Sequence, residues 1–330
     1  MTYHKEGPAC GKIPCDPTSS EADCEYPLDS NQVSPLYQWG EAIKSWKKLR
    51  NDAIIRHVPK SSYFSWKNER NMIQGRKERK MPFEFTSRVR YSETDPEEKL
   101  TLVSLVDYFQ DASTFQSEDC GVGTRFLKKQ DLAWMILSWQ IEILRRPYLA
   151  EPITAQTWPY GFKAFYGYRN YALVDAGKNY LAKANSVWAL IDLQTGKPVR
   201  VAEEHVARYK MEEKLDMEYG PRKLKLPQNC VKREPFTVCR YHLDTNNHVN
   251  NGQYIRMAEE YLPEGFETGY LQVEYKKQAH LHDVIYPYVH QDAQTVTVGL
   301  CDEAGKPYAV LSHRAADSGS DKAAEKREDA

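Results

Sequence analysis

Two periods of hydrophobic and polar positions run through the middle of the chain. Apolar residues spaced three and four positions apart predict a helix with one apolar stripe, formed by Leu102, Leu105, Val106, Phe109 and Ala112. Alternation with a period of two predicts strands near residues 83–91, 132–144, 153–159, 166–174 and 180–192. Asp175-Ala176-Gly177-Lys178 is typical of a hairpin turn between the last two strands. The predicted order is a strand, a helix and then a run of strands.

The same order returns after a charged connection at residues 197–232. A strand is expected at 236–241 and a helix at 251–262, followed by strands near 270–277, 283–290, 294–301 and 307–314. Short matches link the halves: Arg90-Tyr91 with Arg240-Tyr241, residues 140–142 with 272–274, and residues 176–180 with 304–308. Because these matches occur in the same order, the chain is predicted to contain two copies of one fold.

These patterns divide the chain into segments. A first domain is expected at residues 81–200, a linker at 201–232, a second domain at 233–314 and a disordered tail at 315–330. Residues 1–80 form an N-terminal extension predicted to be disordered or partly helical. Two hypotheses concern this extension: either Met81 is the natural start, or the extension is a plastid transit peptide, against which its acidic residues argue.

Composition narrows the class of protein. The chain has 330 residues, 41% of them hydrophobic, and a net charge of −1, which favours an ordinary globular protein and gives no sign of nucleic-acid binding. The longest apolar run, Leu132–Leu137, is too short to span a bilayer. Seven cysteines, an odd number, indicate a reducing compartment. The expected location is cytoplasmic, or the plastid stroma if the extension is a transit peptide.

One polar stretch concentrates the candidate chemistry: Asp244-Thr245-Asn246-Asn247-His248-Val249-Asn250-Asn251. On an extended backbone Asp244, Asn246 and His248 would face the same side and present a carboxylate, an amide and an imidazole to one point. Asn250 or Asn251 is suited to cap the following helix. The alternative interpretation is that this stretch is only a polar turn with a helix cap.

The motif Asp-x-Asn-x-His-Val-Asn-Asn followed by an apolar helix resembles the acyl-acyl-carrier-protein (acyl-ACP) thioesterases, over about residues 81–314. The resemblance implies an α+β fold of two tandem hot-dog domains, each an antiparallel sheet wrapped around a central helix. It also implies release of free fatty acid from acyl carrier protein without a cofactor, and it makes Asp244, Asn246 and His248 the catalytic candidates. A homodimer is compatible with this resemblance.

In the resembled family the first domain supplies the tunnel for the acyl chain. The residues expected to bind substrate are Trp134, Met135, Leu137, Leu105, Phe109, Asn250 and Asn251. The alternative for the apolar residues among them is ordinary core packing. Basic residues that could meet an acidic carrier protein are Arg145, Arg146, Lys276, Lys277, Lys128 and Lys129, although solvated strand ends would look the same.

The chain departs from the family pattern at one place. The family is expected to carry a glutamate followed by cysteine or alanine after the next strand, and here Gln278 and Ala279 stand there. An amide cannot act as a base. Three hypotheses follow: Asp244 is the sole carboxylate, His280 or His282 takes over a basic role, or the protein is a weak enzyme that mainly binds acyl chains. An acyl-CoA thioesterase of the same fold is a further alternative.

No metal site is expected. His280, His282 and Asp283 lack an evident further ligand, and His4, Cys10, Cys15 and Cys24 do not fit a standard zinc spacing.

Overall fold

The computed structural model describes residues 82–317. The predictions for residues 1–80, for the alternative start at Met81 and for most of the tail lie outside this range. No helix within it is long and apolar enough to cross a membrane.

The first copy follows the predicted order. Its strands are β1 (Phe83–Arg88), β2 (Leu132–Ile143), β3 (Pro152–Lys163), β4 (Tyr166–Asp175) and β5 (Tyr180–Asp192). Its long helix is α3 (Leu102–Asp119), which Thr101 caps by accepting a hydrogen bond from the Ser104 amide. A short helix that the sequence pattern did not predict, α4 (Thr124–Lys128), follows it.

The second copy repeats the arrangement. Its helix is α6 (Asn251–Glu259), and its strands are β7 (Phe236–Thr237), β8 (Thr268–Tyr275), β9 (Val284–Gln291), β10 (Thr295–Cys301) and β11 (Pro307–Ala315). Between the copies lie a single helical turn, α5 (Glu203–Val206), and a short strand, β6 (Val231–Lys232), neither of which was predicted. Asn250 caps α6 by accepting a hydrogen bond from the Gly252 amide at 2.8 Å, which confirms one of the two predicted caps.

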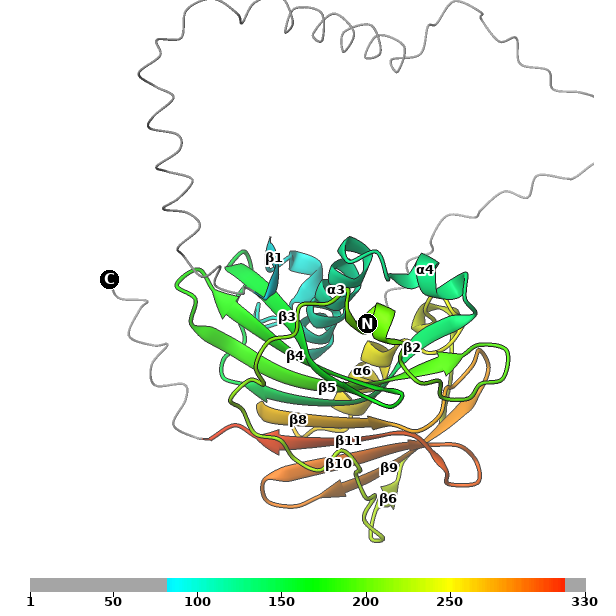
Figure 1. Ribbon diagram of the computed structural model, residues 1–330. Helices are drawn as coiled ribbons and strands as arrows, with labels where there is room; N and C mark the ends of the chain where they lie inside the picture. Colours follow the sequence, from blue (N-terminus) through cyan, green and yellow to red (C-terminus); the bar gives the residue numbers. More distant parts are fainter. Residues whose placement is uncertain (1–81, 318–330) are drawn as a thin grey trace, which may run out of the picture. The chain divides into compact units, whose positions relative to one another are not determined.

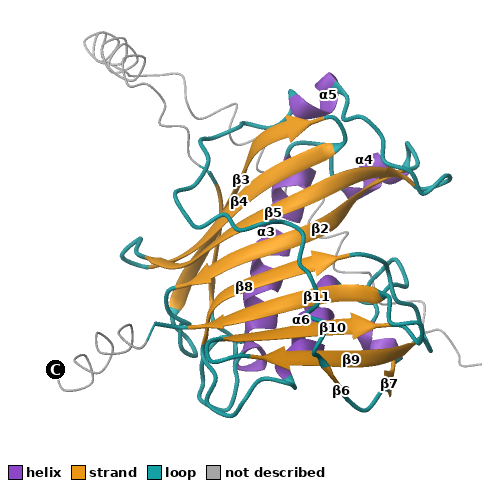
Figure 2. Ribbon diagram, turned by 90° about the horizontal axis from the view of Figure 1, so that it is seen from below, coloured by secondary structure: helices purple, strands orange, loops and turns teal. Residues whose placement is uncertain are grey.

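All the strands join one antiparallel sheet in the order β1-β3-β4-β5-β2-β8-β11-β10-β9-β6, with β7 also on β9. The copies meet where β2 pairs with β8, and Gln140 lies directly opposite Gln272 there. Helices α3 and α6 lie on the same face of the sheet, and the sheet curves around them (Figures 1 and 2). Phe109 of α3 packs against Trp139 and Tyr171 of the sheet, and all three are buried.

The two copies share the turn that leads into their helix, and this fixes their alignment. Asp95 Oδ1 accepts hydrogen bonds from the Glu97 and Lys99 amides, as Asp244 Oδ1 does from the Asn246 and His248 amides. Asp95 therefore corresponds to Asp244. The matches proposed for residues 90–91 with 240–241 and for the hairpins at 176 and 304 are each wrong by one position, because hydrogen bonding equates Tyr91 with Arg240 and Asp175 with Asp302.

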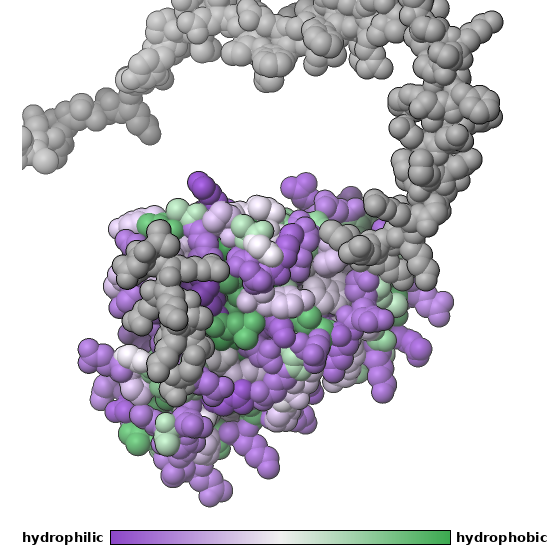
Figure 3. Space-filling model, turned by 90° about the vertical axis from the view of Figure 1, so that its left-hand side faces the viewer, coloured by the Kyte–Doolittle hydropathy of each residue, from purple (hydrophilic) through white to green (hydrophobic). Residues whose placement is uncertain are grey.

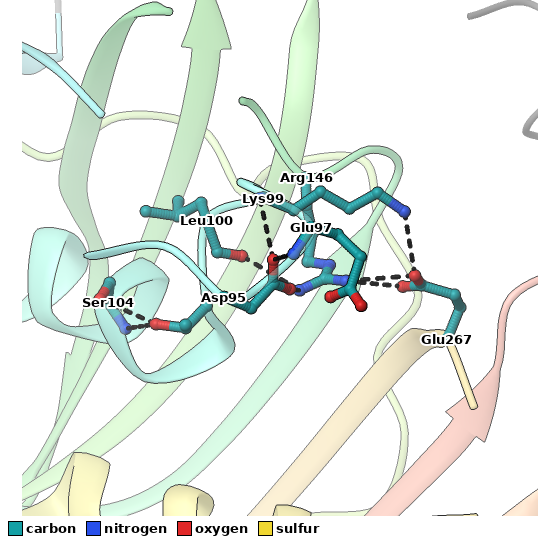
Figure 4. A network of polar contacts seen from close by, with 8 residues as sticks. Asp95, Glu97, Lys99, Leu100, Ser104, Arg146 and Glu267 are labelled. Carbon is teal, nitrogen blue, oxygen red and sulfur yellow. Dashed lines mark hydrogen bonds and ion pairs between the residues drawn. The ribbon is translucent and has the colours of Figure 1, made fainter. Parts of the chain in front are cut away.

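The corresponding place in the first copy is closed by ion pairs (Figure 4). Arg146 stands where the second copy has Gln278, since the amides of Leu100 and Val249 donate to the carbonyls of Pro147 and Ala279 in the same way. The Arg146 guanidinium pairs with Asp95 and, at 3.1 Å, with Glu267, which also accepts from Lys99. The first copy thus has a network of ion pairs where the second copy has the uncharged amides of Asn246 and Gln278 and the imidazole of His248.

The later part of the linker, residues 213–224, lies along the outer face of the sheet, away from the helices (Figure 2). The carbonyls of Glu213 and Gly220 accept hydrogen bonds from Trp158 and Gln140, and the Leu224 amide donates to Glu274. Gln140 and Glu274 are buried as a result, although they lie on the face of the sheet opposite the helices. On the face shown in Figure 3, hydrophilic residues surround small hydrophobic groups, as expected of a globular surface.

Glu259, at the end of α6, should make stability depend on pH. Burial raises its pKa to about 7, against the opposing influence of Arg146 and Arg256. A carboxyl group whose folded pKa lies above its usual 4.5 binds more protons when folded, so its contribution to stability falls as pH rises from about 4.5 to 7. Glu259→Gln should therefore have a free energy of unfolding at pH 8 up to about 3 kcal/mol higher than the wild type. Denaturant titration measures this difference as a higher unfolding midpoint.

At pH 4.5 the two proteins should unfold at nearly the same denaturant concentration. An exposed glutamate just beyond α6 offers a control, Glu264→Gln, which should change the free energy of unfolding equally at both pH values. An equal gain for Glu259→Gln at both pH values would contradict the explanation.

Candidate functional site

A cavity of about 630 Å³ joins the second-copy motif to the first copy. Asp244, Asn246, His248 and Gln278 line it from one side. Trp134, Met135 and Leu137 of β2 line it together with residues of α3 and β4. The candidate catalytic residues of the second copy and apolar side chains of the first copy therefore line the same cavity.

The motif forms a tight turn and not the extended segment that the spacing predicted. The Asp244 amide donates to the His248 carbonyl at 2.8 Å, and Asn247 adopts a positive φ of 60°. Asp244 Oδ1 binds the amides of Asn246 at 2.8 Å and His248 at 3.3 Å. Asp244, Asn246 and His248 do lie on one side, as predicted, but a turn centred on Asp244 places them there and not an extended backbone.

The polar side-chain atoms that could act on a substrate have no hydrogen-bond partner in the described part of the protein. Within residues 82–317, Asp244 Oδ2, the Asn246 amide group, the His248 ring nitrogens and the Gln278 amide group form no hydrogen bond. One Asp244 oxygen thus fixes the turn, while the other is available at the cavity. This is the arrangement expected of groups that bind a ligand or water.

Two short contacts bring the Gln278 segment against the motif. The Val249 amide donates to the Ala279 carbonyl at 3.0 Å, and the Ala279 amide donates to the Tyr254 hydroxyl at 3.0 Å. Asn251 Nδ2 reaches Gln110 of α3 at 3.3 Å, so the motif also contacts the first copy directly. The site is therefore assembled from segments far apart in sequence.

His248 is held close to a second imidazole. Its ring lies edge-to-face with that of His280, with the ring centroids 4.8 Å apart. Burial, followed by the His280 ring, lowers the pKa of His248, while Asp244 acts in the opposite direction. The lowered pKa favours a neutral imidazole at neutral pH, which can accept a proton or orient water.

Three expected substrate residues do not reach the cavity wall. Leu105 and Phe109 are 3% and 0% exposed and belong to the apolar core between α3 and the sheet. Asn250 caps α6 instead. Because the helix stripe is the face that packs on the sheet, the residues of α3 that line the cavity come from beside that stripe: Gln110, Ser113, Thr114 and Ser117.

Sequence reasoning also missed the far wall of the cavity. Tyr168 and Arg169 of β4, Trp188 of β5 and Tyr209 of the linker line it. The only available signal was an arginine in a tyrosine-rich strand, which also fits a solvent-facing strand. Over residues 82–317, no group of three His, Cys, Asp or Glu side chains could hold a metal ion, and the N-terminal cysteines and His4, whose spacing fits no standard zinc site, lie outside that range.

Two family models match the chain in order. The model of the acyl-ACP thioesterase N-terminal domain matches residues 80–209, and that of the C-terminal domain matches residues 227–306. The chain belongs to the acyl-ACP thioesterase family. The motif and Gln278 lie in the C-terminal domain of this family, and the cavity wall from α3 to β5 lies in its N-terminal domain.

Curated relatives in the family are distant. A chloroplastic acyl-[acyl-carrier-protein] hydrolase of Cuphea viscosissima is 25% identical over 213 residues, which are 60% of this chain and 52% of that protein. A chloroplastic dodecanoyl-[acyl-carrier-protein] hydrolase of Cinnamomum camphora is 23% identical over 251 residues, which are 68% of this chain and 61% of that protein. The chain thus spans about half the length of the first relative.

Solved structures of family members share the fold. An acyl-ACP thioesterase of Bacteroides thetaiotaomicron aligns with a TM-score of 0.66 at 21% identity, covering 70% of this chain and 96% of that one. The 12:0-ACP thioesterase of Umbellularia californica aligns with a TM-score of 0.64 at 18% identity, with the same coverage. The α+β fold with two tandem hot-dog domains, predicted from the resemblance, is confirmed.

The histidine pair predicts how catalysis at this site should depend on pH. If neutral His248 is the active form, kcat/KM should fall as pH drops through a pKa below 6.5. Because His280 helps to lower this pKa, His280→Gln should move the acid limb of the profile toward higher pH.

The profile should be measured for wild type, His280→Gln and a control, His290→Gln on β9. The control should leave the acid limb in place. An unmoved limb in His280→Gln, or an equal movement in the control, would show that the pair does not set this profile.

Proposed function

We propose that this protein hydrolyses the thioester between a fatty acyl chain and acyl carrier protein, releasing the free fatty acid. The observation that carries the proposal is the Asp244 carboxylate, which keeps one oxygen in the turn and leaves the other at a cavity bounded by the apolar side chains of β2. Membership of the acyl-ACP thioesterase family and the names of the relatives support this substrate.

In the proposed mechanism Asp244 acts as the general base. Its free oxygen takes a proton from water as the water oxygen attacks the thioester carbon. The Asn246 amide and the His248 ring orient the water and the carbonyl, and a donated N–H stabilises the developing oxyanion. Collapse of the intermediate breaks the carbon–sulfur bond, and the thiolate, which leaves readily, regains the proton.

Gln278 takes no part as a base in this mechanism. Its side chain is exposed at the cavity and forms no internal hydrogen bond within the described residues, so it can donate to or accept from the substrate. The edge-to-face contact between the His248 and His280 rings gives specific support to the alternative in which a histidine takes the basic role. An acyl-binding protein without turnover is disfavoured because it would not need the unused Asp244 oxygen.

The proposed partner is acyl carrier protein. Among the predicted basic contacts, Lys276, Lys277 and Lys128 line the cavity. Lys276 and Lys277 also form ion pairs, with Glu274 and Asp302, and Arg145 and Arg146 form ion pairs with Glu151, Asp95 and Glu267. Surface charge of this kind raises the rate of encounter with an acidic partner. Acyl-CoA remains the alternative substrate, and a cytoplasmic location and a homodimer stay predictions.

The first test separates the two roles of Asp244. In Asp244→Asn the side-chain oxygen can still accept the turn's hydrogen bonds, but the base is lost. Turnover of acyl-ACP thioesters should fall by about 10²–10⁴-fold with little change in melting temperature. The matched control is Asp95→Asn in the first copy, which keeps the equivalent turn and loses the ion pair with Arg146.

Asp95→Asn should lower stability and leave kcat/KM near the wild-type value. If Asp244→Asn retained full turnover, or if both variants lost it equally, Asp244 would not be the base.

The second test concerns Gln278 and the substrate. Gln278→Glu should change kcat by less than about tenfold if Asp244 already supplies the base, since two adjacent carboxylates gain little over one. Turnover should be compared on acyl-ACP and acyl-CoA thioesters of one chain length. An inert wild type with an active Gln278→Glu variant would identify a protein that binds acyl chains without hydrolysing them.

A further inference from the structure

The far wall of the cavity contains a buried cation without a counter-charge. Arg169 of β4 is 8% exposed, and no Asp or Glu among residues 82–317 forms an ion pair with it. Its Nη1 donates to Gln116 and, at 3.2 Å, to Thr157, and its guanidinium stacks on the Tyr209 ring at 5.5 Å. All three of these partners are neutral. Buried charges in proteins are normally paired, so this arginine calls for an explanation.

Most of its hydrogen-bonding capacity is unused. A guanidinium has five N–H donors, and the two acceptors on Nη1 leave Nε and Nη2 without partners in the described structure. The fully buried side-chain atoms without partners in this part of the chain are on Trp139, His205, Glu212 and His313. Nε and Nη2 of Arg169 therefore still face open space, and Arg169 lines the cavity.

This group lies far from the motif. In the sheet order β4-β5-β2-β8, Arg169 is three strand spacings from β8, about 14 Å. The strand register places Arg169 opposite Ser186 of β5, which lies opposite Trp139 of β2, which in turn lies opposite Val273 of β8. Gln278 lies five positions beyond Val273, after β8 has ended. The cavity thus has hydrolytic candidates at one end and an unpaired cation at the other.

We infer that the cavity accepts acyl chains that carry a carboxylate at the end remote from the thioester, with Nε and Nη2 of Arg169 binding its two oxygens. A planar guanidinium with free donors on two nitrogens matches a carboxylate in bidentate geometry, and the ligand supplies the missing negative charge. The inference rests on the proposed thioesterase function and narrows its substrate class. A plain hydrocarbon end would leave the cation unpaired and desolvated.

Turnover tests this substrate class. ACP thioesters of a plain acyl chain and of an ω-carboxy chain of the same length should be compared in wild type and Arg169→Met. The wild type should prefer the ω-carboxy substrate by about tenfold or more in kcat/KM, because sites built for a polar group discriminate strongly against its absence. Arg169→Met should abolish or reverse the preference, and Arg169→Lys, which keeps the charge without the fork, should fall between them.

The control is Arg222→Met, which removes a cation stacked on Tyr166 of the same strand, outside the cavity lining. It should leave the preference unchanged. Melting temperatures would show which variants fold. A wild type that hydrolyses the plain substrate equally well or better, with a ratio that Arg169→Lys does not alter, would overturn the inference while leaving the proposed function intact.

Binding separates the inference from the proposed function. Calorimetry on Asp244→Asn protein, with and without Arg169→Lys, should show that a long-chain dicarboxylic acid binds in an Arg169-dependent way and more tightly than a monocarboxylic acid of equal length. This result without any thioester turnover would support the cavity assignment and refute the thioesterase. Equal, Arg169-dependent binding of both acids would mean that the arginine holds an ordinary fatty acid carboxylate, and would overturn the inference.

Discussion

The antiparallel pairing of β2 with β8 is the interaction on which the rest of the structure depends. It joins two copies of one fold into a continuous sheet, with Gln140 opposite Gln272 at the junction. A hot-dog unit alone would leave the edge of β2 or β8 unpaired, and exposed edges of this kind pair readily with other chains. Joining the copies satisfies both edges and places both helices on one side, so that a cavity can draw on the two copies at once.

Duplication then allowed the equivalent turns to diverge. Both turns keep an aspartate whose Oδ1 binds two backbone amides, because that oxygen builds the turn. The second oxygen differs: in the first copy it pairs with Arg146, and in the second it has no partner among residues 82–317 and belongs to a side chain that lines the cavity. The same residue is therefore structural in one copy and available for chemistry in the other. The exchange of arginine for Gln278 accompanies that difference.

The two ends and the walls of the cavity differ in polarity because they come from different elements of the fold. Its near end is polar because the turn is built on the Asp244 carboxylate, and the side chains of Asn246 and His248 in the same turn also line the cavity. Its walls come from β2, where Trp134, Met135 and Leu137 supply apolar surface. Its far wall is the least expected, because a guanidinium held by neutral partners lies where a tunnel for a hydrocarbon chain would be apolar throughout.

The sequence by itself determined the order of the long helices and strands, the duplication and the motif, because local periodicity and turn chemistry depend on neighbouring residues. The short elements α4, α5 and β6 were not predicted. Through a family resemblance, the sequence also indicated Asp244, Asn246, His248 and Gln278 as site residues, and all four line one cavity in the structure. The alignment of the copies by hydrogen bonds, the turn at Asp244 and the core positions of Leu105 and Phe109 were decided only by the tertiary structure. The tertiary structure also decided the ion pairs of Arg146 and left Arg169 without an ion pair among residues 82–317, because a side chain's partners are set by strands and loops that the chain brings together from distant positions.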